Sequence, residues 1–199
     1  MKVLVVGASG TVGQAVVAEL SKRHDIIAAS RNSATHAVDV QSSASIEALF
    51  QKIGKVDAIV ATVGEVHFGP LTEMSGEQFR VGLNSKLMGQ VELSLIGQRY
   101  LNDGGSITLT SGILSEQPIR LGTNATAVNR AVEGFAVGAA IELPRGIRIN
   151  VVSATVLQES LPSFGPFFVG FEAAPAARVA LAYARSVDGA QNGQVYQVW

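Results

Sequence analysis

The chain has 199 residues, of which 47% are hydrophobic and 16% are charged, and its formal net charge is −1. This length suits a single domain with one sizeable core, and the apolar composition excludes a disordered chain. The near-neutral charge provides no basic field, so neither nucleic acid nor a membrane is expected as a partner. There are no cysteines and only three scattered histidines. Disulfides and thiolate nucleophiles are therefore excluded, and no metal site is predicted.

The first seven residues form a short apolar run that ends at Gly7. This run is too short for the core of a signal peptide, so it predicts a strand. No apolar run reaches the ~18 residues of a membrane span. We therefore expect a cytoplasmic protein.

Apolar, β-branched runs alternate along the chain with stretches of helical period. Strands are predicted at 3–6, 26–29, 37–40, 58–63, 106–110, 147–152 and 195–198, and helices at 12–23, 43–53, 73–101, 123–143 and 173–187. Continuous apolar strands that alternate with helices are typical of a parallel sheet covered on both faces. The sequence therefore predicts one α/β domain over residues 1–199, a Rossmann-type doubly wound parallel sheet with helices on both faces.

One predicted connection is unusually short. Only Arg31–His36 separate the second and third predicted strands. A crossover between parallel strands usually needs a dozen residues or more. Either the connecting helix is reduced to a turn, or residues 37–40 do not form a strand.

The first predicted strand runs into a glycine-rich turn, GASGTVG at residues 7–13, which opens a predicted helix. In this spacing the first glycine serves a tight turn, the second a close backbone approach to phosphates, and the third close helix–strand packing. The free N–H groups and positive dipole end of the helix favour a pyrophosphate. A glycine-rich turn without a ligand is the alternative, but the strand–turn–helix context favours a dinucleotide site. The cofactor-binding candidates in this turn are Gly7, Ser9, Gly10, Thr11, Val12 and Gly13.

The end of the second predicted strand bears on the choice of cofactor. NAD sites usually place an acidic residue there, whereas NADP sites use a nearby arginine for the 2′-phosphate. This chain has Ser30 and Arg31 and no acid. Arg31 can pair with a phosphate through its planar guanidinium, and Ser30 can add a hydroxyl. NADP is therefore favoured, NAD stays possible, and a solvated loop role for Arg31 is the alternative. If the helix after Arg31 is missing, the sheet edge beside the adenine pocket should be unusually open.

With these features, the chain resembles the short-chain dehydrogenase/reductase family over nearly its whole length. The resemblance is carried by the glycine turn, by AVEGF at 131–135, by PRGIRIN at 144–150 and by shorter matches at 38–40, 57–64, 105–111 and 193–195. It implies an oxidoreductase with an unknown carbonyl or alcohol substrate, assembled as a homodimer or homotetramer. It also implies that Asp39 and Val40 border the adenine ring and that Ala61 and Gly64 run along the cofactor.

The catalytic Tyr and Lys typical of that family are missing. In the family they stand four residues apart on one helix face, and the ammonium favours the phenolate. Counted back from residues 131–135, their positions fall on Ala125 and Asn129, and no lysine follows Lys86. Lys86 is two positions from Asn84 and is expected on a different side of that helix. Two hypotheses stay open: an oxidoreductase with a non-standard proton donor, and a catalytically inactive dinucleotide-binding sensor.

Three side chains are candidates for the remaining catalytic roles. Ser111 lies one residue before Gly112, the position of the family's catalytic serine. The family uses an asparagine corresponding to Asn84 to support a water in its proton relay; a polar residue that mends a helix kink is the alternative. His67 could donate a proton near neutral pH, although a loop histidine without a catalytic task is commoner.

Four of the eight phenylalanines lie in one segment, Phe164–Phe171. In the family this region forms a lid over the substrate. Ordinary packing against the core or a partner subunit explains the same composition equally well.

Overall fold

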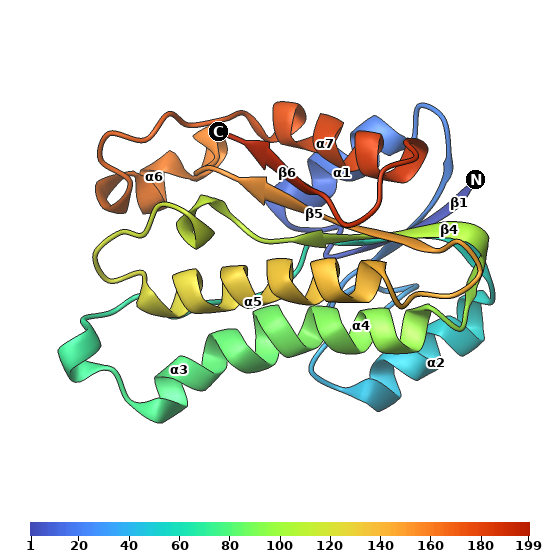
Figure 1. Ribbon diagram of the computed structural model, residues 1–199, viewed down its shortest axis with the longest axis horizontal. Helices are drawn as coiled ribbons and strands as arrows, with labels where there is room; N and C mark the ends of the chain where they lie inside the picture. Colours follow the sequence, from blue (N-terminus) through green and yellow to red (C-terminus); the bar gives the residue numbers. More distant parts are fainter.

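The computed structural model describes residues 1–199 and contains one six-stranded parallel sheet between two layers of helices (Figure 1). The strands lie in the order β2-β1-β3-β4-β5-β6. Every neighbouring pair is parallel. The predicted doubly wound α/β fold is therefore confirmed. The strands are β1 (Lys2–Val6), β2 (Asp25–Ala29), β3 (Val56–Ala61), β4 (Leu101–Thr110), β5 (Arg148–Ala154) and β6 (Val195–Val198).

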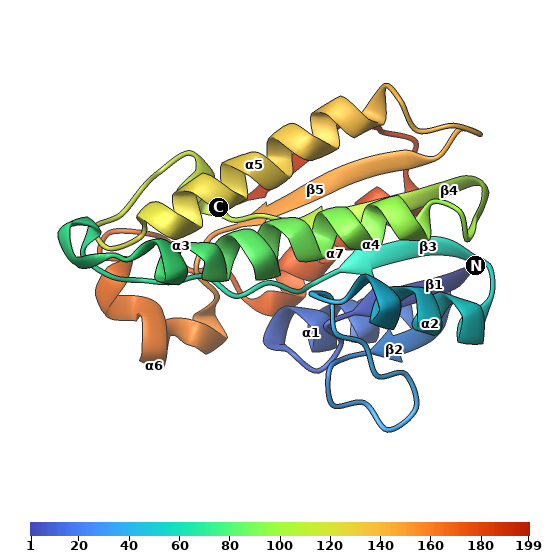
Figure 2. The same cartoon turned by 90° about the horizontal axis from the view of Figure 1, so that it is seen from below.

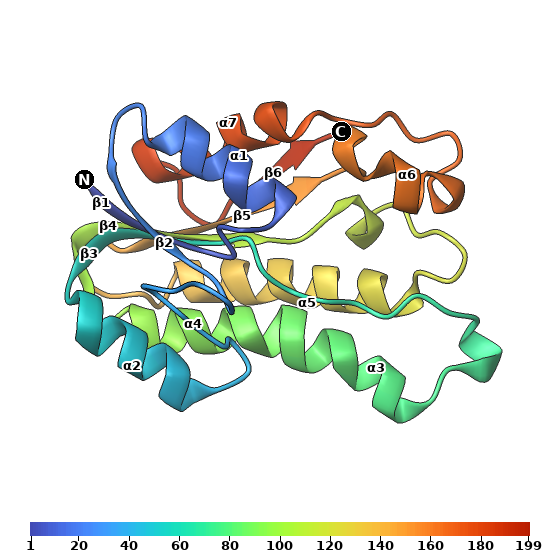
Figure 3. The same ribbon diagram turned by 180° about the vertical axis from the view of Figure 1, so that it is seen from behind.

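The helices cover both faces of this sheet. Figures 1 and 3 show α1 and α7 on one face and α2, α4 and α5 on the other. None of the helices combines the length and apolar composition needed to cross a bilayer. The helices are α1 (Thr11–Leu20), α2 (Ser43–Ile53), α3 (Gly76–Gly82), α4 (Gly89–Gly97), α5 (Thr123–Ala140), α6 (Leu161–Phe164) and α7 (Ala176–Asp188).

Two apolar cores lie on the two faces of the sheet, and strand alternation explains why. Successive side chains of a strand point to opposite faces. In β1, Leu4 and Val6 join the core under α2, whereas Val3 and Val5 join the core under α1 and α7. The continuous apolar run of β1 is therefore needed, because both of its faces are buried.

The predicted strand at 37–40 is wrong. Only a single bridge, between Ser30 and Ala37, pairs this segment with the rest of the sheet. The connection is too short for a helical crossover, so the chain returns through turns to α2. As a result β2 is the edge of the sheet, beside the glycine turn.

The helix predicted at 73–101 is broken into three pieces. A π-helical segment, Leu83–Met88, separates α3 from α4. The fully buried Gln90 follows it, and its amide donates to the carbonyls of Lys86 and Thr110 at 3.0 and 2.9 Å. Its own carbonyl accepts from the Thr110 N–H at 2.8 Å. Gln90 therefore ties the irregular turn to the carboxyl end of β4, which is how a wider helical turn satisfies its backbone groups.

Several segments extend beyond the carboxyl ends of the strands. Figures 1 and 2 show α3 and α6 projecting past that edge of the sheet. In open α/β sheets, ligands bind outside the carboxyl ends of the strands, where the strand order reverses. Here the order reverses between β1 and β3, and the recesses described next lie there.

Candidate active site

A recess of about 210 Å³ lies at the carboxyl end of β1, and we call it the dinucleotide recess. The glycine turn forms one wall, and the loops after β2 and β3 form the others. It is lined by Val6, Gly7, Ser9, Gly10, Ser30, Arg31, Val38, Val40, Thr62 and Val63.

The glycines of this recess are required by close backbone contacts. Gly7 has φ +90°, and a Cβ there would stand 2.6 Å from the carbonyl oxygen of Thr62. A Cβ on Gly13 would stand 2.1 Å from the carbonyl oxygen of Gly7, so α1 packs directly on the turn. Gly10 caps α1 without any side-chain hydrogen bond. The first amides of α1 have no partner within the helix, and they fit a pyrophosphate.

Most predicted cofactor residues lie in or next to this recess. Gly7, Ser9, Gly10, Ser30, Arg31 and Val40 line it, and Thr11, Val12 and Gly13 form the adjoining first turn of α1. Val38, Thr62 and Val63 also line the recess. They were not predicted as cofactor residues, because apolar or small side chains form no recognisable binding motif.

Two predicted cofactor residues lie elsewhere. The Asp39 carboxylate accepts from the Gln41 N–H at 3.0 Å, in the turn that leads into α2, and Asp39 does not line the recess. Ala61 is fully buried inside β3 and also does not line it. The local turn thus engages one carboxylate oxygen of Asp39, and Ala61 packs inside its strand.

A second recess, of about 140 Å³, adjoins the first, and we call it the inner recess. Val63 lines the dinucleotide recess and the next residue, Gly64, lines the inner one, so the two meet at the loop after β3. The inner recess is lined by Gly64, Val66, Phe68, Lys86, Gly112, Ile113, Leu114, Ala125, Asn129, Ala154, Thr155, Val156 and Phe168.

The positions expected for the family's Ser, Tyr and Lys all lie in the wall of the inner recess. They are occupied by Gly112, Ala125 and Asn129. Asn129 is 4% exposed, and its Oδ1 has no hydrogen-bond partner. The inner recess therefore holds a buried acceptor that is free to bind a ligand donor.

Lys86 is the ionisable side chain of the inner recess. Burial lowers the pKa of its ammonium to about 8. Gly64, with φ +127°, packs so closely on Lys86 that a Cβ would stand 2.6 Å from Lys86 Cγ. The loop after β3 and the lysine stem are therefore held directly against each other.

Asn84, the candidate for supporting a water of the proton relay, does not line the inner recess. It is exposed and lines a separate shallow recess with Val40, Gln41 and Glu92. Asn84 and Lys86 do lie on different sides of the helix, as predicted. Of the two side chains, Lys86 lines the inner recess. The extra residue in a π-helical turn changes which side chains of this helix face the recess.

Ser111 and His67 also lie outside the walls of the inner recess. The Ser111 hydroxyl donates to Glu133 Oε1 at 2.6 Å in a buried contact under α5. The backbone N–H of His67 donates to Asn124 Oδ1 at 2.9 Å, and its ring is absent from the wall although both neighbours line it. The geometry therefore favours structural roles for both residues.

The phenylalanine-rich segment combines the two roles considered for it. Phe168 lines the inner recess. Phe164 and Phe167 pack on Phe68, which also lines the recess, with ring centroids 5.9 and 5.8 Å apart. The segment around α6 thus covers the recess through ordinary aromatic packing.

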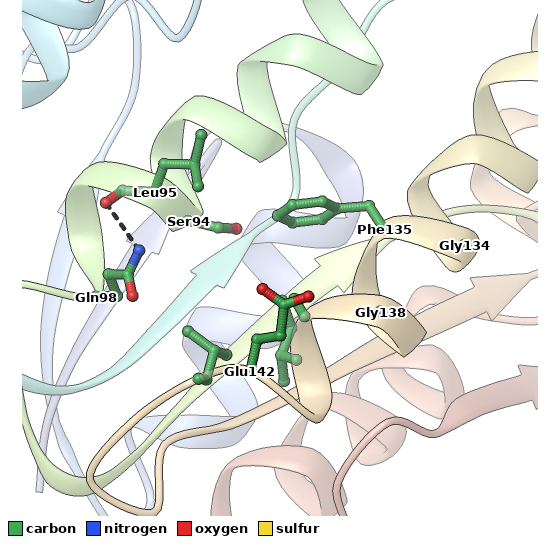
Figure 4. Close-up of a pocket in the computed structure, with 10 residues that line it drawn as sticks. Ser94, Leu95, Gln98, Gly134, Phe135, Gly138 and Glu142 are labelled. Atoms are coloured by element: carbon green, nitrogen blue, oxygen red, sulfur yellow. Dashed lines mark hydrogen bonds between the residues drawn. The ribbon is translucent and has the colours of Figure 1, made fainter.

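A further recess, of about 390 Å³, lies between α4 and α5 (Figure 4). Its floor is apolar, and Phe135 extends from α5 toward α4 across it. The Gln98 amide at its rim donates to the Leu95 carbonyl at 3.3 Å. Gly134 and Gly138 leave the α5 surface open, since nothing lies within 4 Å of a Cβ at either. This recess carries no catalytic grouping.

The chain is similar to known proteins in both sequence and structure. A family model described as Enoyl-(Acyl carrier protein) reductase matches residues 6–197. A crystal structure of a Listeria innocua protein is 51% identical with TM-score 0.98, covering 100% of both chains. A small-chain dehydrogenase crystallised in complex with NADPH is 26% identical with TM-score 0.89, covering 100% of this chain and 96% of that one.

Curated relatives match over a shorter region. An uncharacterised oxidoreductase of Methylorubrum extorquens is 28% identical over 115 residues, which is 57% of this chain and 46% of that protein. The chain thus spans about half the length of the curated relatives it matches. The family match covers nearly all of the sequence, and the six-stranded sheet agrees with the solved structures. The chain therefore belongs to the short-chain dehydrogenase/reductase family.

Proposed function

We propose that this protein is an NADP-dependent oxidoreductase that interconverts a small carbonyl compound and its alcohol. The observation that carries the proposal is the junction of the two recesses at Val63 and Gly64. A dinucleotide with its pyrophosphate at the glycine turn would extend from one recess toward the other. Its reactive end would then lie beside the positions where the family places its catalytic residues.

The choice of NADP rests on the loop after β2. Arg31 lines the dinucleotide recess, and its guanidinium can bind a 2′-phosphate through paired hydrogen bonds. An acidic residue, which would repel that phosphate, is absent from Ser30 to His36. The similar dehydrogenase crystallised with NADPH agrees with this choice.

In this proposal the dinucleotide recess binds the cofactor, and the inner recess binds the substrate. The glycine turn and the first amides of α1 hold the pyrophosphate, and Arg31 holds the phosphate of the adenosine. A reduced nicotinamide, when bound, supplies a hydride. The inner recess excludes water from the substrate with Phe68, Phe168 and the apolar end of β5. The buried Asn129 Oδ1, which has no partner, can accept a hydrogen bond from a donor group of the substrate.

We also propose a homodimer or homotetramer, because α4 and α5 expose apolar side chains around an open recess. Val137 on α5 and Ile141, which follows α5, are 54% and 88% exposed, and Leu95 on α4 is 49% exposed. Apolar surface of this kind is typical of an interface with a second copy.

The proposed function is tested in two steps on the purified protein. Calorimetric titration should give tighter binding of NADPH than of NADH. A panel of small ketones and aldehydes should then show consumption of NADPH with formation of the alcohol. Tight NADPH binding with no turnover over the whole panel would contradict the oxidoreductase and favour the dinucleotide-binding sensor. No binding of either dinucleotide would contradict both.

A further inference from the structure

We propose that Lys86 is the proton donor of the inner recess, in place of the tyrosine and lysine that the family positions Ala125 and Asn129 lack. This inference rests on the oxidoreductase function proposed above. It assigns a catalytic role to a residue of the π-helical segment, which lies far along the chain from α5, where the family's pair would stand.

The walls of the inner recess leave one side chain able to give up a proton. Besides Lys86, the polar side chains that line it belong to Asn129 and Thr155. An amide such as Asn129 does not ionise near neutral pH. The Thr155 hydroxyl already donates to the Glu172 carbonyl at 2.9 Å. A substrate oxygen in this recess can therefore obtain a proton from protein only at Lys86 Nζ.

Three contacts hold the π-helical turn and the Lys86 side chain in place. Gln90 holds the Lys86 carbonyl at 3.0 Å and ties it to Thr110 at the end of β4. The Ser85 hydroxyl accepts from the Glu65 N–H at 2.9 Å, which joins the same turn to the loop after β3. Gly64 packs on Cα, Cβ and Cγ of Lys86. The π-helical turn is thus clamped to two strand ends, and such anchoring is what a catalytic group needs.

The charge around Lys86 suits a proton donor. None of the residues that line the inner recess is acidic. The carboxylates in neighbouring segments are engaged elsewhere: Glu65 pairs with Arg31, and Glu133 accepts from Ser111. Burial without a counter-charge lowers the pKa of the Lys86 ammonium to about 8. The group is then mostly protonated at neutral pH and far more acidic than an exposed lysine, as general acid catalysis requires.

The reaction balances with this one donor. In reduction, the carbonyl carbon gains a hydride, which NADPH supplies, and the π electrons of the C=O bond move to oxygen. That oxygen takes a proton from Lys86 Nζ, so the products are an alcohol and a neutral amine. The amine regains a proton from solvent water. In oxidation the neutral amine accepts the proton of the alcohol.

The first test measures the ionisation of Lys86 without any turnover. NMR titration of ¹³C-labelled lysine side chains should show one Cε signal with a midpoint near pH 8, absent from Lys86→Met. The exposed lysines should titrate near ~10.4. A Lys86 signal that titrates with the exposed lysines would overturn the proposal.

The second test separates proton donation from simple attraction of an anionic substrate. Lys86→Met and Lys86→Arg should both lower kcat by about 10²-fold or more, because arginine keeps the charge but does not release a proton. Both variants should bind NADPH as tightly as the original protein. Lys55→Met, at an exposed lysine, is the matched control and should keep full activity.

Each outcome of the second test has a separate meaning. Full kcat in Lys86→Arg with a raised KM in Lys86→Met would overturn proton donation and assign Lys86 to substrate binding. Turnover that survives in both variants would overturn any role for Lys86 while the oxidoreductase function stands. Absence of turnover in the unmodified protein would overturn the oxidoreductase function, and the catalytic role of Lys86 with it.

Discussion

Arg31 and Glu65 form an ion pair with an N–O distance of 3.1 Å across the carboxyl end of β1. The pair joins the loop after β2 to the loop after β3. The two side chains are 59% and 60% exposed, so the pair contributes at most about 1 kcal/mol. Because Arg31 also lines the dinucleotide recess, Glu65 competes with any phosphate that binds there.

The first prediction concerns this competition. Glu65→Gln should tighten NADPH binding by about 2–5-fold, because the variant removes a weak competitor for Arg31. Its affinity for NADH should not change, which serves as the internal control. Arg31→Asp should abolish the preference for NADPH by placing a repelling charge beside the phosphate. Fluorescence titration of both dinucleotides measures these ratios, and an unaltered ratio in both variants would refute the role of Arg31.

The second prediction concerns the stability cost of Lys86. The pKa of its ammonium is about 8 in the folded protein and near ~10.4 in an unfolded chain. Between these values the unfolded state binds more protons, so this group makes stability rise with pH from about 8 to about 10. Below pH 8 both states are protonated, and the cost of burying the ammonium is fully present.

Lys86→Met should therefore raise the free energy of unfolding at pH 7, on the order of 1–3 kcal/mol. The gain should shrink as the pH rises toward 10, because the native lysine becomes neutral. Urea denaturation at several pH values measures this difference, with Lys55→Met as the control. A variant that is equally or less stable at pH 7 would show that the ammonium is not desolvated.

The third prediction concerns Gln90, which we regard as a positioning residue. Gln90→Leu removes both hydrogen bonds to Thr110 and the one to the Lys86 carbonyl. Leaving these buried groups unpaired should destabilise the protein by about 1–3 kcal/mol. Hydrogen exchange at the Thr110 amide should accelerate, and the Lys86 pKa should move toward the ordinary value as the turn loosens. Loss of stability with an unchanged Lys86 titration would indicate a purely structural role.

The fourth prediction concerns assembly through α4 and α5. Leu95→Asp together with Val137→Asp should reduce the particle mass measured by light scattering, because each places a charge on the exposed apolar face. Leu71→Asp changes a similarly exposed apolar residue outside these helices and should leave the mass unchanged. A 20.7 kDa particle for the unmodified protein at micromolar concentration would contradict the proposed assembly.

The local sequence was sufficient to predict those parts of the fold that depend on contacts between residues close together in the chain. The glycine spacing at residues 7–13 could be read locally because Gly13 packs against Gly7 within the same segment, although Gly7 itself also packs against the distant Thr62. The helix at 43–53 was predicted with its observed bounds, since Ser42 caps it by accepting from the Ser45 N–H and Gly54 ends it with φ +70°. The strands followed from apolar runs buried on both faces.

Other features depended on contacts between distant segments. The placement of the Lys86 side chain in the inner recess follows from a π-helical turn. Gln90 stabilises this turn through hydrogen bonds to Thr110, twenty residues away. The family resemblance proposed Asn84 as a catalytic candidate, whereas the residue of this helix that lines the inner recess is Lys86. Ser111 was a candidate for the catalytic serine, and its hydroxyl donates a hydrogen bond to Glu133 on α5, a residue distant in the sequence.

The sequence alone thus determined the sheet, the glycine turn and the absence of the family's tyrosine and lysine from their positions. The tertiary structure decided which ionisable side chain, that of Lys86, lines the inner recess together with Ala125 and Asn129. The physical reason is that a turn's hydrogen bonds and a lysine's desolvation both depend on what packs against them. Here those partners come from β4 and from the loop after β3, and no window of the sequence contains all of them.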